Sequence, residues 1–170
     1  MDLKKYIRNI PNFPKEGILF RDITPLLAEV SAYQEALNKM AEFVSYSGAE
    51  AIVAIESRGF MFACPVAEKL KLPFVPVRKP GKLPHKTKSV EYELEYGKGT
   101  LQIHDDVIKE GMKAAVIDDL LATGGTASAA ARLIEACGGV VCSYSFLIEL
   151  RALGGRKLLN NADIQALIAY

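Results

Sequence analysis

The sequence predicts an α/β fold: a single domain with a mainly parallel central sheet flanked by helices, and an inserted flexible hairpin. Three observations support this fold class. Short apolar runs of strand length alternate with segments of helical spacing, an order typical of parallel sheets with helical crossovers. Hydrophobic residues make up 50% of the 170 positions, which is enough for one full core. No repeat or linker divides the chain, so we expect one domain over residues 1–170.

A helix over residues 31–48 is the best-marked element near the start. Its apolar residues share one face, Ser31 and Gln34 predict a capping box, and Gly48 predicts a left-handed end. The remaining core elements are predicted in this order: strand 51–55, helix 60–70, strand 73–77, strand 113–117, helix 126–137 and strand 140–150. Prolines place the second of these strands at a sheet edge or strand end. The pattern at 162–170 fits a strand or a helix.

A basic segment and a hairpin interrupt this alternation. Residues 78–88, RKPGKLPHKTK, are rich in Lys and Arg and predict a mobile basic loop. The side chains of such a charge run usually point into solvent without another role, and we expect this of half of its cations. The alternating residues that follow turn at 97–99, Gly-Lys-Gly, and predict an antiparallel hairpin.

Overall charge and targeting signals narrow the function classes. Lys and Arg total 21 against 20 Asp and Glu, so no basic field indicates nucleic-acid binding. The charged start MDLKKYIRNIPNFP has no apolar signal region, and no run of 18 apolar residues indicates a membrane span. Three cysteines, an odd number, fit a reducing, cytoplasmic setting. Cys137 and Cys142 are too few for a structural zinc site with only His85 and His104 elsewhere.

Two adjacent carboxylates follow the apolar run AAVI. Asp118 and Asp119 come first, and the residues from Thr123 to Thr126, Thr-Gly-Gly-Thr, then open the next helix. Backbone amides at a helix start form an anion site, yet the carboxylates would repel a phosphate. A ribose 5-phosphate satisfies both halves, because each hydroxyl-to-carboxylate bond contributes roughly 1.5–3 kcal/mol. The alternative is a solvated Asp-Asp turn that caps the helix.

These motifs resemble a known family. The chain has neither GxxxxGK[ST] nor GxGxxG, so a P-loop ATPase or a dinucleotide fold is not supported. VIDDLLATGGT resembles the phosphoribosyl-pyrophosphate motif of the type I phosphoribosyltransferases. FPKEGILFRDITPLL, ESRGFMF, RKPGKLP and ELEYGKGTLQIH resemble the branch that acts on adenine, and the likeness extends to LIELRALGGRKLL. It implies a base-binding arm at about 1–30 and a flexible catalytic loop at about 79–104.

The resemblance also implies the residues that bind the phosphoribosyl donor. The ribose and its phosphate are assigned to Asp118, Asp119, Ala122, Thr123, Gly124, Gly125 and Thr126. Pyrophosphate is assigned to Glu56, Ser57, Arg58, Arg78, Lys79 and Lys82, although some branches have Asp where Glu56 stands. Arg78 or its neighbour is implied to reach the active site of a partner subunit, and hence a homodimer. Without the resemblance, Arg58 also fits a surface arginine paired with a nearby acid.

Adenine binding and proton transfer are assigned by the same resemblance. The base is expected to stack on Phe20, with main-chain groups of Leu19 and Arg21 reading its edge. Glu95 is the implied catalytic residue, with Tyr96 beside it on the hairpin that closes over the substrate. From the residues alone, Phe20 fits an anchor of the arm in the core. Alternation likewise puts Glu91, Glu93 and Glu95 on one plain acidic strand face.

The implied activity is transfer of a 5-phosphoribosyl group to N9 of adenine, giving AMP and pyrophosphate in purine salvage. Mg²⁺ is the expected cofactor, held mainly by substrate oxygens and water. The expected partners are adenine, phosphoribosyl pyrophosphate and a second copy of the chain, without nucleic acid or membrane. One alternative is a phosphoribosyltransferase for 6-oxopurines, from which FRDITP and LEYG point away. Another is a DNA-binding regulator, for which residues 2–8 leave no room for a basic DNA-binding segment.

Overall fold

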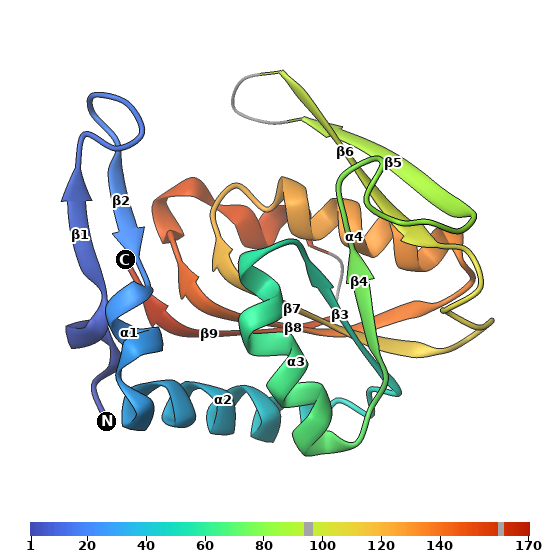
Figure 1. Cartoon of the computed structure of the whole chain (residues 1–170), viewed down its shortest axis with the longest axis horizontal. Helices are drawn as coiled ribbons and strands as arrows, with labels where there is room; N and C mark the ends of the chain where they lie inside the picture. The colour runs from blue at the N-terminus through green and yellow to red at the C-terminus, as the bar shows by residue number, and fades with distance from the viewer. Residues whose placement is uncertain (94–96, 160–161) are drawn as a thin grey trace.

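A five-stranded parallel sheet forms the centre of the computed structural model, which describes residues 1–93, 97–159 and 162–170. The strand order is β4–β3–β7–β8–β9, and every neighbouring pair is parallel (Figure 1). The strands are β3 (Ala51–Ile55), β4 (Phe74–Val77), β7 (Lys113–Leu121), β8 (Val140–Glu149) and β9 (Asp163–Ala169). The predicted parallel sheet and the edge position of β4 are confirmed. The undecided segment at 162–170 is a strand.

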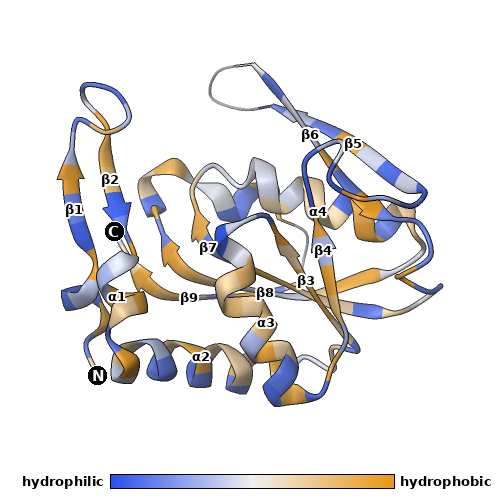
Figure 2. Cartoon of the chain, in the orientation of Figure 1, coloured by the Kyte–Doolittle hydropathy of each residue, from blue (hydrophilic) through white to orange (hydrophobic). Residues whose placement is uncertain are grey.

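Helices cover both faces of this sheet. On one face lie α2 (Val30–Ser45) and α3 (Arg58–Leu70); on the other lie α4 (Gly125–Ala136) and the hairpin of β5 (Thr87–Glu93) and β6 (Lys98–His104). Ile52 and Ala54 of β3 pack toward α2 and α3, whereas Val53 packs toward α4. Each large aliphatic side chain buried in this way contributes about 1.5–3 kcal/mol. Figure 2 shows the resulting band of apolar strands between the helices.

The first 28 residues form an arm beside the sheet. It contains the short 3₁₀ helix η1 (Leu3–Tyr6), the strands β1 (Arg8–Pro11) and β2 (Leu19–Asp22), and the helix α1 (Thr24–Ala28). The two strands pair antiparallel in a hairpin of their own. Figure 1 shows this hairpin projecting away from the body, with the end of the chain lying next to β2.

Several element boundaries differ from the sequence predictions, and those of α2 are one case. The cap of α2 is Glu29 and not Ser31: its carboxylate accepts hydrogen bonds from Ser31 N at 3.3 Å and Ser31 Oγ at 2.7 Å. The helix therefore begins at Val30, before the predicted capping box, and it ends at Ser45 with a right-handed C-cap at Tyr46. Gly48 is left-handed as predicted (φ +70°), but it lies beyond this end. The capping box was wrong because Ser31 lies inside the first turn, where its hydroxyl donates to Glu29.

The turn of the β5–β6 hairpin was also misplaced. Lys98 and Gly99 are paired with Glu93 and Tyr92 across the hairpin, so they belong to β6. Gly99 is glycine for packing, because a Cβ there would come within 2.7 Å of the Tyr92 ring. The antiparallel hairpin itself is confirmed, while the flexibility expected of it stays a prediction.

Candidate functional site

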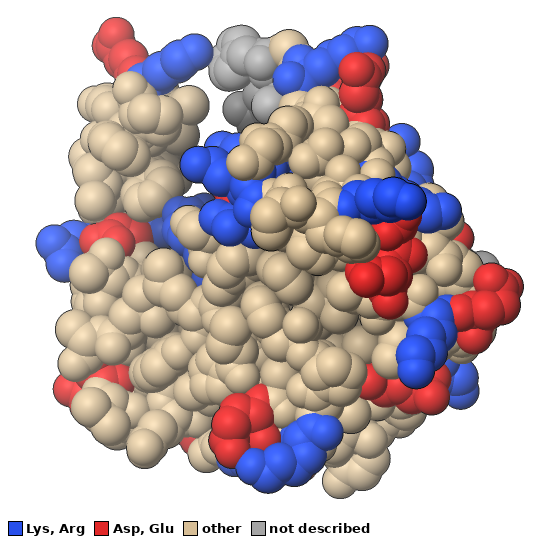
Figure 3. All heavy atoms as spheres, turned by 45° about the vertical axis from the view of Figure 1, so that its right-hand side comes forward, with Lys and Arg blue, Asp and Glu red and all other residues tan. Residues whose placement is uncertain are grey.

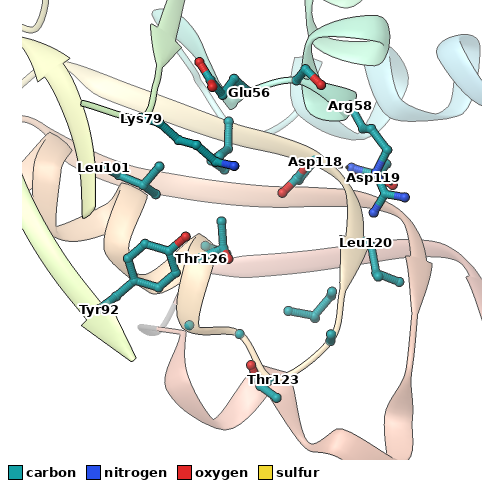
Figure 4. A pocket seen from close by; sticks show the side chains of 17 residues that line it. Glu56, Arg58, Lys79, Tyr92, Leu101, Asp118, Asp119, Leu120, Thr123 and Thr126 are labelled. Atoms are coloured by element: carbon teal, nitrogen blue, oxygen red, sulfur yellow. Dashed lines mark hydrogen bonds and ion pairs between the residues drawn. The ribbon is translucent and has the colours of Figure 1, made fainter. Parts of the chain in front are cut away.

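A polar cavity of about 440 Å³ lies at the carboxyl edge of the sheet. Residues 55–58, from the end of β3 to the start of α3, form one wall, and residues 118–127, from β7 to the start of α4, form another. Lys79, Tyr92 and Leu101 complete the cavity (Figure 4). Parallel strands bring their carboxyl ends to one edge, which is where ligands bind in open α/β sheets. Most of the predicted donor-binding residues are therefore brought together here.

Asp118 lies inside β7 and points into this cavity (Figure 4). The strand continues to Leu121, four residues beyond its predicted end, so the acidic pair belongs to the sheet. Gly59 makes room for the carboxylate, because a Cβ there would lie 2.8 Å from Asp118 Oδ1. Burial and then the neighbouring Asp119 charge raise the pKa of Asp118 well above its usual range. Among the described residues it has no cationic partner within ion-pair distance.

Asp119 is more deeply enclosed and is paired with an arginine. Only 5% of the residue is exposed, and its Oδ2 lies 3.0 Å from Arg58 Nε. Burial raises the pKa of this carboxyl, although the Arg58 charge acts in the opposite direction. The Arg58 guanidinium also lies 5.5 Å from the centre of the Phe20 ring. Arg58 is therefore paired with an acid, as the alternative interpretation of this residue predicted. Its side chain also lines the cavity.

The loop between β7 and α4 is suited to a phosphate group. Gly124 has a left-handed backbone (φ +86°), and α4 begins at the next residue. The first backbone N–H groups of a helix have no acceptor within the helix, and they carry the positive end of its dipole. Thr123 and Thr126 add hydroxyl donors on the wall of the cavity. This arrangement agrees with the anion site predicted from Thr-Gly-Gly-Thr.

A second loop packs against the loop between β7 and α4, and the sequence did not indicate this contact. A Cβ on Gly155 would overlap with Ala122 O and would lie 3.0 Å from Gly124 N, so the two backbones are packed directly together. The adjacent Arg156 fixes this loop through two bonds to Glu149, at 2.7 and 2.9 Å. Arg156 also holds the pKa of the Glu149 carboxyl below its usual range.

The basic side chains that were predicted to bind pyrophosphate do not all line the cavity. Lys79 lines it, whereas Arg78 bonds through Nε to Glu56 Oε2 at 2.7 Å and through Nη1 to the carbonyl of Lys82 at 3.3 Å. Lys82 itself is exposed and does not line the cavity. Figure 3 shows basic side chains gathered around the hollow beside the N-terminal hairpin. An anionic ligand would therefore approach through a positive opening.

A second cavity of about 440 Å³ adjoins the first and is mainly apolar. Leu19, Phe20 and Arg21, the predicted adenine residues, line it from the hairpin side. The body of the protein supplies the facing wall, which consists of Leu150, Ala152, Leu153 and Tyr170. Arg58, Leu120 and Ala122 line both cavities. Phe20 is therefore a wall of a cavity and also packs edge-on against Phe13, with ring centres 5.1 Å apart.

Glu95 and Tyr96 lie outside the described residues. Their neighbour Tyr92 lines the polar cavity, while Glu91 and Glu93 are exposed. Tyr92 was missed by the sequence analysis, although alternation in VEYELEY places it on the face opposite these glutamates. Tyr170 and Leu153 were missed as well. Nothing local marks them, because they reach the second cavity only when β8 and β9 lie side by side.

Carboxylates that could serve a metal are few in the polar cavity. Three carboxylates line it among the described residues: Glu56 is bonded to Arg78 and Asp119 to Arg58, which leaves Asp118. Elsewhere in the described chain, His85, Asp105 and Asp106 have ligand atoms within 4.8 Å of one another, but all three are exposed and line neither cavity. No helix in the described ranges is both long and apolar enough to cross a membrane.

Comparison with known proteins agrees with this geometry. Residues 26–149 match the phosphoribosyl transferase domain family. The chain belongs to the phosphoribosyltransferases. Within the family, it is 54% identical to the adenine phosphoribosyltransferase of Pseudothermotoga lettingae and 52% identical to that of Thermotoga petrophila, with both chains covered completely.

Solved structures place the whole phosphoribosyltransferase chain in the same branch. The adenine phosphoribosyltransferase of Thermoanaerobacter pseudethanolicus is 50% identical and superimposes with a TM-score of 0.96, over 99% of this chain and 98% of that one. The Saccharomyces cerevisiae enzyme, solved with adenine and an imino-altritol bisphosphate, is 38% identical, with a TM-score of 0.91 over 98% and 96%. The type I fold predicted from the motifs is confirmed.

Proposed function

We propose that this phosphoribosyltransferase transfers the 5-phosphoribosyl group of 5-phospho-α-D-ribose 1-diphosphate to N9 of adenine, giving AMP and diphosphate for purine salvage. One observation carries this proposal: a polar cavity with an acidic pair and a helix start adjoins an apolar cavity with an aromatic wall, and they share Arg58, Leu120 and Ala122. Two substrates of different character can thus meet at one shared boundary.

The polar cavity holds the phosphoribosyl donor. The 5′-phosphate binds the free N–H groups and hydroxyls of residues 123–126, where a helix start favours negative charge. Asp118 accepts hydrogen bonds from the ribose hydroxyls, and its charge stabilises the positive charge that develops on the sugar as diphosphate leaves. Arg58 and Lys79 lie on the same wall as residues 55–57 and neutralise the departing diphosphate.

The apolar cavity holds adenine. Its faces pack against Phe20 and the aliphatic residues of the facing wall, and main-chain groups of Leu19 and Arg21 read its edge. Glu95 exchanges a proton with the purine ring or orients it, in a site closed by the hairpin that carries Tyr96. Adenine held in this way has its N9 directed toward the boundary shared by the two cavities.

Mg²⁺ fits the donor set of the polar cavity. Asp118 is its one carboxylate without an arginine partner among the described residues, so diphosphate and ribose oxygens and water supply most of the ligands. When bound, the ion screens the charge of the diphosphate. We further propose that the enzyme is a cytoplasmic homodimer in which Arg78 and Lys82 lie near the diphosphate.

A product assay tests the function directly. The enzyme is incubated with the phosphoribosyl donor and Mg²⁺, and with adenine, hypoxanthine, guanine or orotate in separate reactions, and the nucleotide formed is identified. We expect AMP from adenine and at most traces of product from the other bases. A nucleotide formed mainly from hypoxanthine or guanine would support the 6-oxopurine alternative. Binding of the donor without any product would support a regulatory protein.

A further inference from the structure

The N-terminal hairpin needs an attachment to the body of the protein if it is to form half of a base pocket. Within the part of the chain that the structure describes, its strands β1 and β2 pair only with each other, and Figure 1 shows them projecting beside the sheet. Leu19, Phe20 and Arg21 nevertheless face Leu150, Leu153 and Tyr170 across the apolar cavity. The width of that cavity therefore depends on how the hairpin is held.

Tyr170 is the residue of the body to which the hairpin is attached, and its backbone is held by the central sheet. Its backbone N–H donates to Glu149 O at 3.0 Å, and its carbonyl accepts from Arg151 N at 2.9 Å, so it continues the ladder between β9 and β8. The position of the ring is thus determined by the central sheet. The ring also forms part of the cavity wall.

Two cations from the arm lie over this ring. The Arg21 guanidinium carbon is 3.6 Å from the ring centre, and Lys4 Nζ is 4.2 Å from it. Arg21 also bonds to Asn9 on the paired strand β1, so the contact holds both strands of the hairpin. Arg21 Nε is buried and has no hydrogen-bond partner among the described residues, so the aromatic face is a main partner of this guanidinium. Cation–π contacts of this kind strengthen when they are shielded from water.

We propose that Tyr170 is a positioning residue for the base: by stacking with Arg21 it fixes the hairpin at the distance from the body that adenine requires. The inference rests on the proposed function for the identity of the base. The contacts of Tyr170 with Arg21 and Lys4 do not depend on which base is bound. The donor site does not include Tyr170, so its affinity should be independent of the ring.

Three variants separate the ring face from other roles of the side chain. Tyr170→Leu removes the aromatic face and keeps an apolar side chain, Tyr170→Phe keeps the face, and Tyr46→Leu makes the same change at a residue that is 84% exposed. Initial rates of AMP formation give KM for adenine and for the donor. We expect Tyr170→Leu to raise the adenine KM about three- to tenfold, in proportion to a lost cation–π contact. The donor KM should stay within about twofold, and the other two variants should resemble the wild type.

Amide hydrogen exchange of the ligand-free protein tests the docking without any assay of activity. In Tyr170→Leu, residues 8–22 should exchange faster than in the wild type, while β3 and β7 keep their rates. Unchanged exchange in the hairpin would overturn the docking, and an unchanged adenine KM beside faster exchange would overturn its role in base binding. A Tyr170→Phe variant as impaired as Tyr170→Leu would overturn the role of the ring face. Wild-type protein that makes no AMP would instead refute the proposed function, and the exchange result would still decide the docking.

Discussion

Asp118 meets two conflicting demands with one side chain. In the proposed function the charged form of Asp118 binds the ribose, yet burial and the neighbouring Asp119 raise the pKa of its carboxyl. For an acid with a raised pKa, the contribution to stability is present in full below the usual Asp pKa. It is lost as the pH rises through the raised pKa. At neutral pH, Asp118 therefore lowers the free energy of unfolding of the ligand-free protein.

Asp118→Asn should separate these two effects. We expect the variant to be more stable than the wild type at pH 7 by roughly 0.5–2 kcal/mol, because a neutral amide avoids the burial of charge and can still accept from Asp119 N. The difference should vanish below about pH 4, where the wild-type carboxyl is protonated in both states. Turnover should fall about 10²-fold or more. Urea unfolding at both pH values and steady-state rates provide the test.

Asp119→Asn is the matched control for this prediction. It removes a carboxylate that already has Arg58 as a partner and whose pKa is raised less strongly than that of Asp118, so it should stabilise the protein less than the first variant does. An Asp118→Asn protein that unfolds more easily at pH 7, or that keeps wild-type turnover, would contradict our account of the acidic pair.

Glu95 is the residue whose role depends most on the family resemblance. If it transfers a proton, Glu95→Gln and Glu95→Leu should both lose about 10²–10⁴-fold in turnover, while adenine still binds. If it only orients the base, Glu95→Gln should keep most of the activity. Glu91→Gln and Glu93→Gln are internal controls, since both residues are exposed. Equal losses in these controls would place the catalytic group elsewhere.

At the scale of elements, the segment after β8 packs against the loop between β7 and α4, which is the proposed phosphate loop. Gly155→Ala should raise KM for the phosphoribosyl donor about tenfold and cost about 1–3 kcal/mol of stability, because the new methyl group must push against Ala122 O and Leu121. KM for adenine should change little. Donor-dependent initial rates and chemical unfolding measure both effects.

The neighbouring glycine supplies the control for that substitution. Gly154 has a left-handed backbone (φ +66°), but a Cβ there would meet nothing closer than 3.7 Å. Gly154→Ala should therefore lose stability through backbone strain and leave the donor KM unchanged. If both alanine variants changed KM equally, general loosening of the segment would explain the result better than support of the phosphate loop.

The elements were predictable where a pattern is local, and their junctions were not. AIVAI is buried on both faces as expected, because a parallel strand with helices on both sides is apolar throughout. The end of β7 was misjudged because polar residues such as Asp118 normally mark the end of a strand. The role of Gly155 depends on contact with Ala122 and Gly124 of a loop far earlier in the chain, which no spacing within the segment reveals.

For the whole molecule, the fold and the polar cavity could be anticipated more completely than the apolar one. Residues 118–126 are contiguous, so one motif contains most of the donor site. The wall of Leu150, Leu153 and Tyr170 assembles only when the ends of β8 and β9 approach the N-terminal hairpin. The motif for the base, GILFRDI, gave the hairpin side of this pocket and no information about the side that faces it.

Assembly of two chains gives a prediction at the same scale. Arg78→Ala should raise the donor KM about tenfold, because Glu56 loses its charged partner beside the diphosphate. Since Arg78 bonds to Glu56 of its own chain, hybrids with Asp118→Asn protein should be no more active than the average of the parents. Activity assays of purified hybrid dimers measure this. Recovery above that average would instead mean that Arg78 acts across the interface, as the resemblance implies.

Arg58, Leu120 and Ala122 belong to both cavities, and this sharing constrains the binding equilibria of the two ligands. A ligand that shifts these residues in one cavity changes the free energy of binding in the other. Thermodynamic linkage makes the effect reciprocal: if the sugar donor tightens adenine by some factor, adenine must tighten the donor by the same factor. If the kinetics suggest that the two substrates bind in a fixed order, this coupling energy is enough to explain it. One substrate then does not need to create the binding site of the other.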